Sequence, residues 1–187
     1  MTLKEYKIQF TNTLVAIYDE KEIESFFYIL LEAYQKLKRI DYALNPNQEL
    51  NSEELSRWET SLNELKKEKP IQYILGETEF FGLPFYVNEN TLIPRPETEE
   101  LVSWILQSLK FNPNLSGQSS KLRILDIGTG TGCIAISLAK NLPDAEVFAL
   151  DVSEKAIEVA QKNATKNNVK ITFLHQSILE TEDLKKQ

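Results

Sequence analysis

Residues 123–139 read RILDIGTGTGCIAISLA, and this stretch decides the fold. An apolar run typical of a β-strand leads into Gly128, Gly130 and Gly132, and an apolar pattern with helical spacing follows at once. Glycines let the backbone turn tightly and approach a ligand, and the first turn of a helix offers N–H groups to that ligand. The stretch therefore predicts a strand, a ligand-binding turn and the start of a helix.

The spacing of these glycines distinguishes three kinds of nucleotide-binding turn. A phosphate-binding loop needs the pattern G-x-x-x-x-G-K-[ST], and no lysine follows the glycines before Lys140. A dinucleotide fingerprint, G-x-G-x-x-G, needs a glycine where Cys133 stands. The sequence is instead D-I-G-T-G-T-G, and its Asp126 precedes the first glycine.

The next expected strand, AEVFALDVS, ends in an acid that suits a ribosyl ligand. Asp151 is placed to accept hydrogen bonds from both hydroxyls of a ribose, like the acid about 20 residues beyond a dinucleotide-binding turn. S-adenosylmethionine is the best fit, because its binding fold commonly carries the shorter glycine pattern. The alternative is a turn that only connects a strand to a helix, and Asp126 and Asp151 weigh against it.

Strand and helix patterns alternate around the turn, as they do in an α/β protein with a parallel sheet. The segment TLIPRPETEELVSWILQSLKF opens an earlier helix with Pro96 near its first position, and a polar loop follows at 112–120. The segment TEFFGLPFYV predicts two short strands around a turn at Gly82-Leu83-Pro84. Strands are also expected at 121–127, 145–150 and 169–175, and helices at about 131–141 and 153–167.

The first 70 residues predict a small helical bundle. Asn51 or Ser52 is the expected N-cap of one helix, Glu54 completes a capping box with Asn51, and Pro70 ends that helix. Apolar side chains at spacings of three and four indicate the other helices. Helices are expected over much of 3–18, over 22–40 and over 51–70.

The bulk composition is ordinary for a globular protein and narrows the classes of partner. Of the 187 residues, 42% are hydrophobic and 26% are charged, and the net charge of −7 argues against a general nucleic-acid-binding surface. The single cysteine, Cys133, excludes an intrachain disulfide framework, which fits a reducing cytosol. No signal peptide and no apolar run of membrane-spanning length is found. We therefore expect a cytoplasmic protein that binds neither membranes nor, directly, nucleic acid.

Three segments together carry a family resemblance. PIQYILGETEFFGLPFYVNENTLIPRPETEELV, ILDIGTGTGCIAISLA and ALDVSEKAIEVAQKNA closely resemble the release-factor glutamine methyltransferases, the HemK or PrmC family. The resemblance covers 70–178 with specific motifs, and the LIPRPETE segment beside DIGTGTG makes it selective. It implies a class I S-adenosylmethionine-dependent methyltransferase domain with a Rossmann-like α/β fold. The implied parts are a helical substrate-recognition domain at 1–70, a β-hairpin linker at 71–92, and the N-terminal part of the methyltransferase domain at 93–187.

The resemblance also implies an activity and a set of cofactor-binding residues. The family methylates the side-chain amide nitrogen of the glutamine in the Gly-Gly-Gln motif of peptide-chain release factors, which are the implied partners. Carried onto this sequence, Asp151 would hold the ribose of S-adenosylmethionine, and Leu179 would cover a face of the adenine. The turn would line the methionine and ribose parts of the cofactor with Gly128, Thr129, Gly130, Thr131 and Gly132.

The sequence departs from the family in two places. Ile178 stands where the family often has an acid, so the contact to the adenine amino group is missing or comes from the backbone. The family's Asn-Pro-Pro-Tyr motif, which accepts the hydrogens of the substrate amide, follows a fourth strand and does not occur in these 187 residues. We therefore expect an incomplete methyltransferase domain, a fragment of a longer protein, that is inactive by itself. We assign no catalytic residue and no metal ligand.

Two other functions stay open at this point. One is a nucleic-acid amino-group methyltransferase, which shares the cofactor fold, although the acidic charge and the LIPRPETE segment weigh against it. The other is a non-catalytic binding module. Arg95 and Glu97 form either a salt-bridged helix start or part of the cofactor pocket. Cys133 is expected to pack in the interior, and His175 to be an ordinary residue at a strand end.

Overall fold

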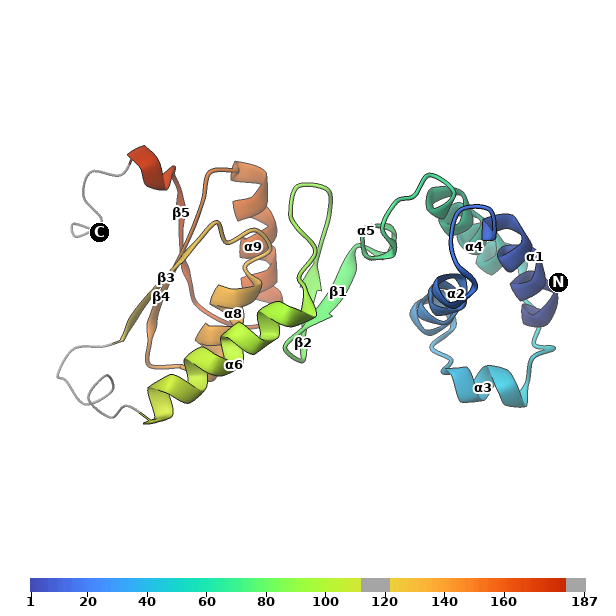
Figure 1. The fold of residues 1–187 in the computed structure, drawn as a ribbon, viewed down its shortest axis with the longest axis horizontal. Coiled ribbons are helices and arrows are strands. Elements are labelled where there is room, and N and C mark those ends of the chain that lie inside the picture. The colour runs from blue at the N-terminus through green and yellow to red at the C-terminus, as the bar shows by residue number, and fades with distance from the viewer. Residues whose placement is uncertain (112–121, 181–187) are drawn as a thin grey trace. The chain divides into compact units, whose positions relative to one another are not determined.

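The computed structural model describes residues 1–111 and 122–180, and its contacts divide the chain into two compact units (Figure 1). One unit comprises Met1–Leu75 and the other Gly76–Gln187. The polar loop expected at 112–120 lies outside the described residues. The domain bounds expected from the sequence, at residues 70 and 92, stay predictions.

The first unit is helical, and local capping interactions explain where its helices begin. At Asn51, the side chain accepts a hydrogen bond from the Glu54 N–H, and the Glu54 carboxylate accepts one from the Asn51 N–H. This confirms the predicted capping box. Thr2 and Glu5 make the same reciprocal pair at the first helix. The helices are α1 (Leu3–Leu14), α2 (Glu20–Gln35), α3 (Arg39–Leu44), α4 (Ser52–Leu65) and α5 (Ile71–Leu75).

Three helix boundaries differ from the prediction. The helix expected over 22–40 ends at Gln35, because Lys36 adopts a left-handed conformation with φ 57° and its N–H bonds to the Glu32 carbonyl. The helix expected to reach Pro70 ends at Leu65. Residues 71–75, which were expected to begin the hairpin segment, form α5. Leu37 continues the apolar spacing and packs on the same core, so periodicity alone cannot reveal the break at Lys36.

The helical unit has its own aromatic core. Trp58 lies at its centre, with ring centroids 5.1 Å from Phe27 and 5.3 Å from Tyr6. The Trp58 indole N–H donates to the Gln35 side-chain oxygen at 3.1 Å, so its polar atom is satisfied inside the core. The buried hydrophobic residues of this core are Leu3, Tyr6, Phe10, Leu14, Ile23, Phe27, Leu30, Leu31, Leu50, Trp58, Leu62, Leu65 and Ile71.

The second unit begins with an antiparallel hairpin of β1 (Glu77–Phe80) and β2 (Leu83–Tyr86). Phe81 and Gly82 form its two-residue turn, and both have positive φ, as the favoured turn of such hairpins requires. The expected turn at Gly82-Leu83-Pro84 is therefore wrong, because Leu83 and Pro84 already belong to β2.

A parallel three-stranded sheet follows the hairpin, in the spatial order β3-β4-β5. This confirms the predicted α/β architecture with a preceding helical region. Pro96 opens α6 as predicted. The elements are α6 (Pro96–Phe111), β3 (Arg123–Ile127), α8 (Cys133–Asn141), β4 (Glu146–Asp151), α9 (Glu154–Lys166), β5 (Thr172–His175) and the 3₁₀ turn η1 (Ile178–Glu180).

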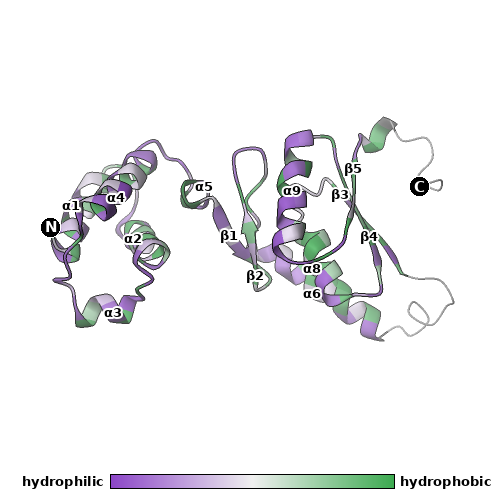
Figure 2. Ribbon diagram, turned by 180° about the vertical axis from the view of Figure 1, so that it is seen from behind, coloured by the Kyte–Doolittle hydropathy of each residue, from purple (hydrophilic) through white to green (hydrophobic). Residues whose placement is uncertain are grey.

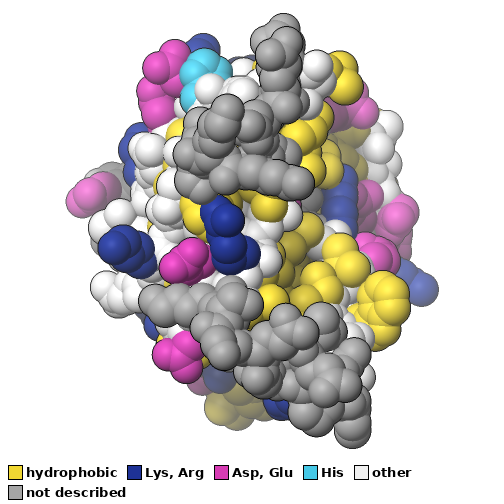
Figure 3. Space-filling model, turned by 90° about the vertical axis from the view of Figure 1, so that its left-hand side faces the viewer, with side chains coloured by type: hydrophobic (Ala, Val, Ile, Leu, Met, Phe, Trp, Pro, Cys, Tyr) yellow, Lys and Arg dark blue, Asp and Glu magenta, His cyan; other side chains and the backbone are white. Residues whose placement is uncertain are grey.

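The described helices of this unit pack on one face of the sheet, as Figures 1 and 2 both show. Ile124 points to that face and packs against the cluster of buried residues that includes Ile136 of α8. Its neighbour Leu125 and the next alternate residue, Ile127, lie on the opposite face and are exposed. Figure 3 looks onto this side of the unit and shows hydrophobic side chains gathered there. Parallel sheets are normally covered on both faces, so the sheet is incomplete within the described residues.

Within residues 1–111 and 122–180, none of the helices has both the length and the apolar character of a membrane-spanning segment.

Candidate cofactor site

The glycine turn lies where β3 ends, beside the end of β4. The backbone φ angles of Gly128, Gly130 and Gly132 are 74°, 55° and 80°, a conformation that residues other than glycine rarely adopt. The N–H groups of Gly128 and Thr129 both donate to the Leu150 carbonyl, at 2.8 and 3.0 Å. The turn is therefore held against β4 by its own backbone.

Asp151, the last residue of β4, contacts the turn directly. Its Oδ2 accepts a hydrogen bond from the Gly130 N–H at 2.9 Å, and its Oδ1 accepts one from the Ser153 N–H at 2.9 Å. Its side chain is largely buried. Carboxyl ends of parallel strands meet at one edge of a sheet, which is where α/β proteins bind their ligands. The structure thus brings Asp151 and the glycine turn together at that edge.

The three glycines face different surroundings. A Cβ at Gly128 or Gly130 would meet no atom within 4 Å, so both positions border open space. A Cβ at Gly132 would lie 2.9 Å from Ile136 Cδ1 and 3.2 Å from Ala160 Cβ. Gly132 therefore allows close packing of the turn on α9, whereas Gly128 and Gly130 leave room on the side where a ligand could approach.

The backbone N–H groups of the turn are mostly engaged within the protein. Besides the bonds of Gly128, Thr129 and Gly130, the Gly132 N–H donates to the Thr129 carbonyl at 2.8 Å. A ligand at this turn would thus meet the open side of the glycines more than a row of free N–H groups. This differs from a phosphate-binding loop, in which the N–H groups point at the ligand.

Two threonines and Asp126 complete the turn. Thr129 and Thr131 are both buried. The Thr129 hydroxyl donates to Asp126 Oδ2 at 2.7 Å. Burial raises the pKa of Asp126 above its ordinary value and the charge of Asp151 raises it further, while the Thr129 hydrogen bond acts in the opposite direction. Two carboxylates therefore lie near the same turn in unequal environments.

Cys133 and His175 have structural surroundings. Cys133 begins α8, and burial raises the pKa of its thiol, which disfavours the reactive thiolate. The exposed His175 ring hydrogen-bonds to the Val152 carbonyl at 3.0 Å through Nε2. The expectations that Cys133 packs in the interior and that His175 is an ordinary residue at a strand end stay predictions.

The residues expected near an adenine lie in η1, beyond β5. Leu179 is 93% exposed and Ile178 is 37% exposed. An exposed leucine next to the ligand-binding edge is free to cover an aromatic ring, and this role of Leu179 stays a prediction. Arg95 and Glu97 are both exposed at the start of α6, so the two interpretations of this pair stay open.

Sequence reasoning missed three polar residues that hold the hairpin to the rest of the unit. Glu99 Oε1 accepts a hydrogen bond from the Phe81 N–H at 2.7 Å. Asn163 of α9 and Asn167, the C-cap residue directly after it, bond to the backbone of β2. The available signal is that Asn163 falls on the buried face of α9, in line with Ala156 and Ala160, and that Asn167 follows four residues later.

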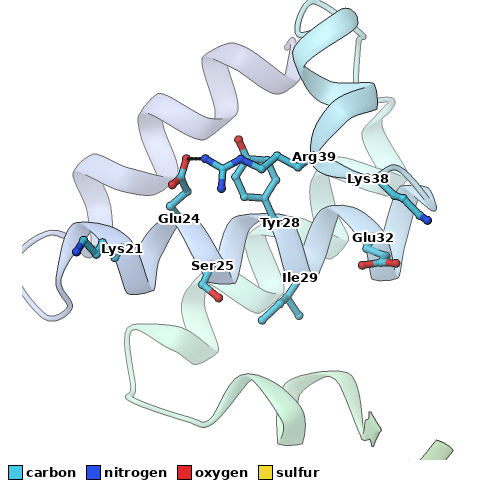
Figure 4. Close-up of a pocket in the computed structure, with 8 residues that line it drawn as sticks. All are labelled: Lys21, Glu24, Ser25, Tyr28, Ile29, Glu32, Lys38 and Arg39. Atoms are coloured by element: carbon cyan, nitrogen blue, oxygen red, sulfur yellow. Dashed lines mark hydrogen bonds and ion pairs between the residues drawn. The ribbon is translucent and has the colours of Figure 1, made fainter. Parts of the chain in front are cut away.

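A separate groove of 540 Å³ lies on the helical unit, at α2 and the segment that leads into α3 (Figure 4). Arg39 lies over the ring of Tyr28, with its Cζ 4.8 Å from the centroid, and pairs with Glu24 at 3.2 Å. Lys7 contacts the same Tyr28 ring and the same Glu24. Lys7 and Arg39 thus share the Glu24 carboxylate, and Lys21, Lys38 and Glu32 add charges of both signs to the lining of the groove.

Known proteins resemble both units of the chain. Residues 7–76 match the family described as PrmC N-terminal domain, and residues 118–187 match the family described as methyltransferase domain. The release factor glutamine methyltransferase of Flavobacterium psychrophilum is 63% identical over 188 residues, which cover 100% of this chain and 64% of that protein.

Two further relatives with the same name come from other bacteria. The Enterococcus faecalis protein is 42% identical over 83% of this chain and 53% of its own length, and the Streptococcus pneumoniae protein is 40% identical over 97% and 61%. The chain thus spans less than two thirds of the length of each of these relatives. Because the Flavobacterium psychrophilum relative is 63% identical over the whole of this chain, and both family models match it, the chain belongs to the release factor glutamine methyltransferase family.

Proposed function

We propose that the protein binds S-adenosylmethionine at the edge formed by the glycine turn and Asp151. The observation that carries the proposal is the contact of Asp151 with Gly130 beside the open space at Gly128 and Gly130. The Asp151 carboxylate accepts hydrogen bonds from the ribose hydroxyls, and the glycines make room for the ribose and methionine parts. Thr129 and Thr131, which are buried, and Gly132, which packs on α9, support the turn from the interior of the unit.

The proposed reaction is methyl transfer to the side-chain amide nitrogen of the glutamine in the Gly-Gly-Gln motif of release factors. Its support is the name shared by the relatives, together with the LIPRPETE and DIGTGTG segments. S-adenosylmethionine supplies an electrophilic methyl group bound to sulfur. The sulfur–methyl bond breaks as the nitrogen–methyl bond forms, and the nitrogen loses a proton. An amide nitrogen is a weak nucleophile, so the protein must hold it in line with the methyl group.

The helical unit is the proposed recognition part for the release factor. It has its own core and belongs to a family named for the N-terminal domain of these enzymes. The methyltransferase unit then holds the cofactor. We expect no direct contact with nucleic acid, in keeping with the net charge of −7.

Isothermal titration calorimetry with S-adenosylhomocysteine tests the cofactor site on the 187-residue chain. We expect saturable binding with one site per chain. Adenosine triphosphate is the matched control, because it carries the same ribosyl adenine but adds a triphosphate for which the turn has no phosphate-binding lysine. Absence of saturable binding by S-adenosylhomocysteine, or equal binding of both ligands, would contradict the proposed cofactor.

Methyl transfer is tested with tritiated S-adenosylmethionine and a release factor as substrate. The 187-residue chain is compared with a chimera that carries, after Gln187, the rest of the Flavobacterium psychrophilum relative. We expect turnover by the chimera. The 187-residue chain should be slower by about 100- to 1000-fold or more, because no segment of these 187 residues matches the motif that accepts the amide hydrogens. A release factor with its Gly-Gly-Gln glutamine replaced by alanine should accept no methyl group. Equal rates for the two chains would place the amide-orienting groups before Gln187.

A further inference from the structure

Asn163 is the most completely engaged polar side chain near the candidate site. It lies in α9 and is fully buried. Its Oδ1 accepts a hydrogen bond from the Tyr86 N–H at 2.6 Å. Its Nδ2 donates to the Tyr86 carbonyl at 3.0 Å and to the Thr131 carbonyl at 2.9 Å. One side chain therefore binds the hairpin strand and the glycine turn at once.

The neighbouring Asn167 provides an internal comparison. It is the C-cap residue directly after α9, four residues beyond Asn163, and is nearly as buried. Its Nδ2 donates to the Pro84 carbonyl at 2.9 Å and to the Asn163 carbonyl at 3.0 Å. Four residues of helix advance about 6 Å, and two residues of strand advance about 6.7 Å. The two asparagines can therefore bond to two alternate residues of β2. Of the two asparagines, Asn163 is the one that also bonds to the glycine turn, at the Thr131 carbonyl.

The contact with Thr131 lies at the point where the turn enters α8. Thr131 stands between Gly130, whose N–H bonds to Asp151, and Gly132, which packs on Ala160 of α9. An amide donor on the Thr131 carbonyl fixes the orientation of the Thr131–Gly132 peptide, whose N–H donates to the Thr129 carbonyl on the other side of the turn. A peptide that rotated there would carry Gly130 away from Asp151 or close the space beside it.

We propose that Asn163 is a positioning residue for the cofactor, acting through the Thr131 carbonyl and holding the glycine turn to the hairpin. The inference rests on the proposed S-adenosylmethionine site. It assigns the residue no contact with the cofactor itself. Its effect is to keep the open side of Gly130 and the Asp151 carboxylate in the arrangement that binds the ribose.

Two variants of Asn163 and one matched control test the inference. Asn163→Leu removes all three hydrogen bonds at similar size, and Asn163→Asp keeps the acceptor for the Tyr86 N–H but loses the amide donors. Asn167→Leu removes a buried tie between the same helix and the same strand without touching the turn. Each protein is titrated with S-adenosylhomocysteine, and its unfolding midpoint in urea is measured.

We expect both Asn163 variants to bind S-adenosylhomocysteine at least tenfold more weakly than the unmodified chain, and Asn167→Leu to bind within about twofold of it. Both leucine variants should show lower urea midpoints, since each leaves at least one backbone carbonyl without the side-chain donor that it has in the unmodified chain. Equal loss of affinity in Asn163→Leu and Asn167→Leu would overturn the inference, because a general loss of packing would then explain both.

Hydrogen exchange over residues 128–134 gives a readout without ligand. We expect faster exchange in both Asn163 variants and unchanged exchange in Asn167→Leu. If the unmodified chain binds no S-adenosylhomocysteine, the proposed cofactor is wrong, and the exchange data still decide whether Asn163 holds the turn. Unchanged exchange in Asn163→Asp, which keeps its bond to the hairpin, would refute the positioning role even if Asn163→Leu failed to fold.

Discussion

Asp151 joins two functions in one side chain, because it holds the glycine turn and is the proposed ribose ligand. We expect Asp151→Ala to weaken the binding of S-adenosylhomocysteine by about 1–3 kcal/mol, through loss of charge-assisted hydrogen bonds. Calorimetry measures the change. Glu154→Ala is the control, since Glu154 is an exposed acid three residues away. Equal affinities of Asp151→Ala and the unmodified chain would remove Asp151 from the site.

Gly130 and Gly132 should respond differently to the same substitution. Gly130→Ala adds a methyl group to open space in a left-handed conformation, at a cost of about 1–2 kcal/mol in stability, and it obstructs the ligand. Gly132→Ala has the same conformational cost and also crowds Ile136 and Ala160, which adds about 1–3 kcal/mol. In urea unfolding, Gly132→Ala should be the less stable of the two variants. In calorimetry, Gly130→Ala should bind S-adenosylhomocysteine more weakly than its loss of stability alone would explain. The reverse ranking would show that the ligand does not approach at Gly130.

Asp126 makes stability depend on pH in a direction that can be worked out. Its pKa is raised in the folded protein, mainly by burial, from about 3.9 in an unfolded chain. The folded state therefore binds the proton more tightly, and this contribution to stability is present at low pH and is lost as the pH rises through the raised pKa. We expect the stability of the unmodified chain relative to Asp126→Asn to fall as the pH rises from about 4 toward 7. Urea unfolding at several pH values measures it, and a rise over that interval would contradict the raised pKa.

At the scale of elements, β3 presents two faces with opposite requirements. We expect Ile124→Thr, on the helix-covered face, to lower the free energy of unfolding by about 1–3 kcal/mol by burying a hydroxyl. Leu125→Thr, on the exposed face, should change stability by no more than about 0.5 kcal/mol and reduce self-association. Urea unfolding and light scattering check the pair. A larger loss of stability in Leu125→Thr would mean that this face is covered in the 187-residue chain.

The elements also show how far sequence reasoning reaches. The parallel direction of β3, β4 and β5 follows from the alternation of strand and helix patterns, and the capping box at Asn51 follows from the local sequence pattern. The end of α2 depends on one left-handed residue, Lys36, whose side chain carries no signal for that conformation. The sequence predicts the hairpin turn at Gly82-Leu83-Pro84, whereas the chain turns at Phe81 and Gly82, with Phe81 in a conformation that favours glycine.

The candidate site divides in the same way. The glycines and Asp151 are adjacent to strand ends in the sequence, so their meeting follows from the parallel sheet. The link from Asn163 to Thr131 and Tyr86 spans 32 and 77 residues, and a lone asparagine on a helical face does not identify such partners. On the buried face of α9, Asn163 stands out from its alanine neighbours because it is polar. This indicates that its side chain makes a hydrogen bond, but it does not identify the partner.

At the scale of the whole molecule, the helical unit has a self-contained core, so we expect residues 1–75 to fold without the rest of the chain. A unit of this size has a stability of about 3–5 kcal/mol. Trp58 is buried at its centre, so its fluorescence and the far-UV circular dichroism should change together in urea. Two transitions, or none, would show that the core depends on residues beyond 75.

A shorter piece that ends at residue 70 provides the comparison. It lacks Ile71, which is buried in the same core, together with Ile74 and Leu75, which pack on it. Losing the burial of Ile71 alone should lower the stability by about 1.5–3 kcal/mol. Equal stability of the two pieces would support a domain boundary at residue 70, as expected from the sequence.

Asn163 of α9 and Asn167 directly after it also affect which other chains can pair with the hairpin. An outer strand of a small sheet normally offers unpaired carbonyl and N–H groups, to which a strand of another molecule can add. In β2 the carbonyl of Pro84 and both backbone groups of Tyr86 are already bonded to Asn167 and Asn163, and Pro84 has no N–H to offer. The helix thus replaces a neighbouring strand along this edge. The β2 edge of the hairpin is therefore protected against the addition of a strand from another molecule by two asparagine side chains as well as by Pro84.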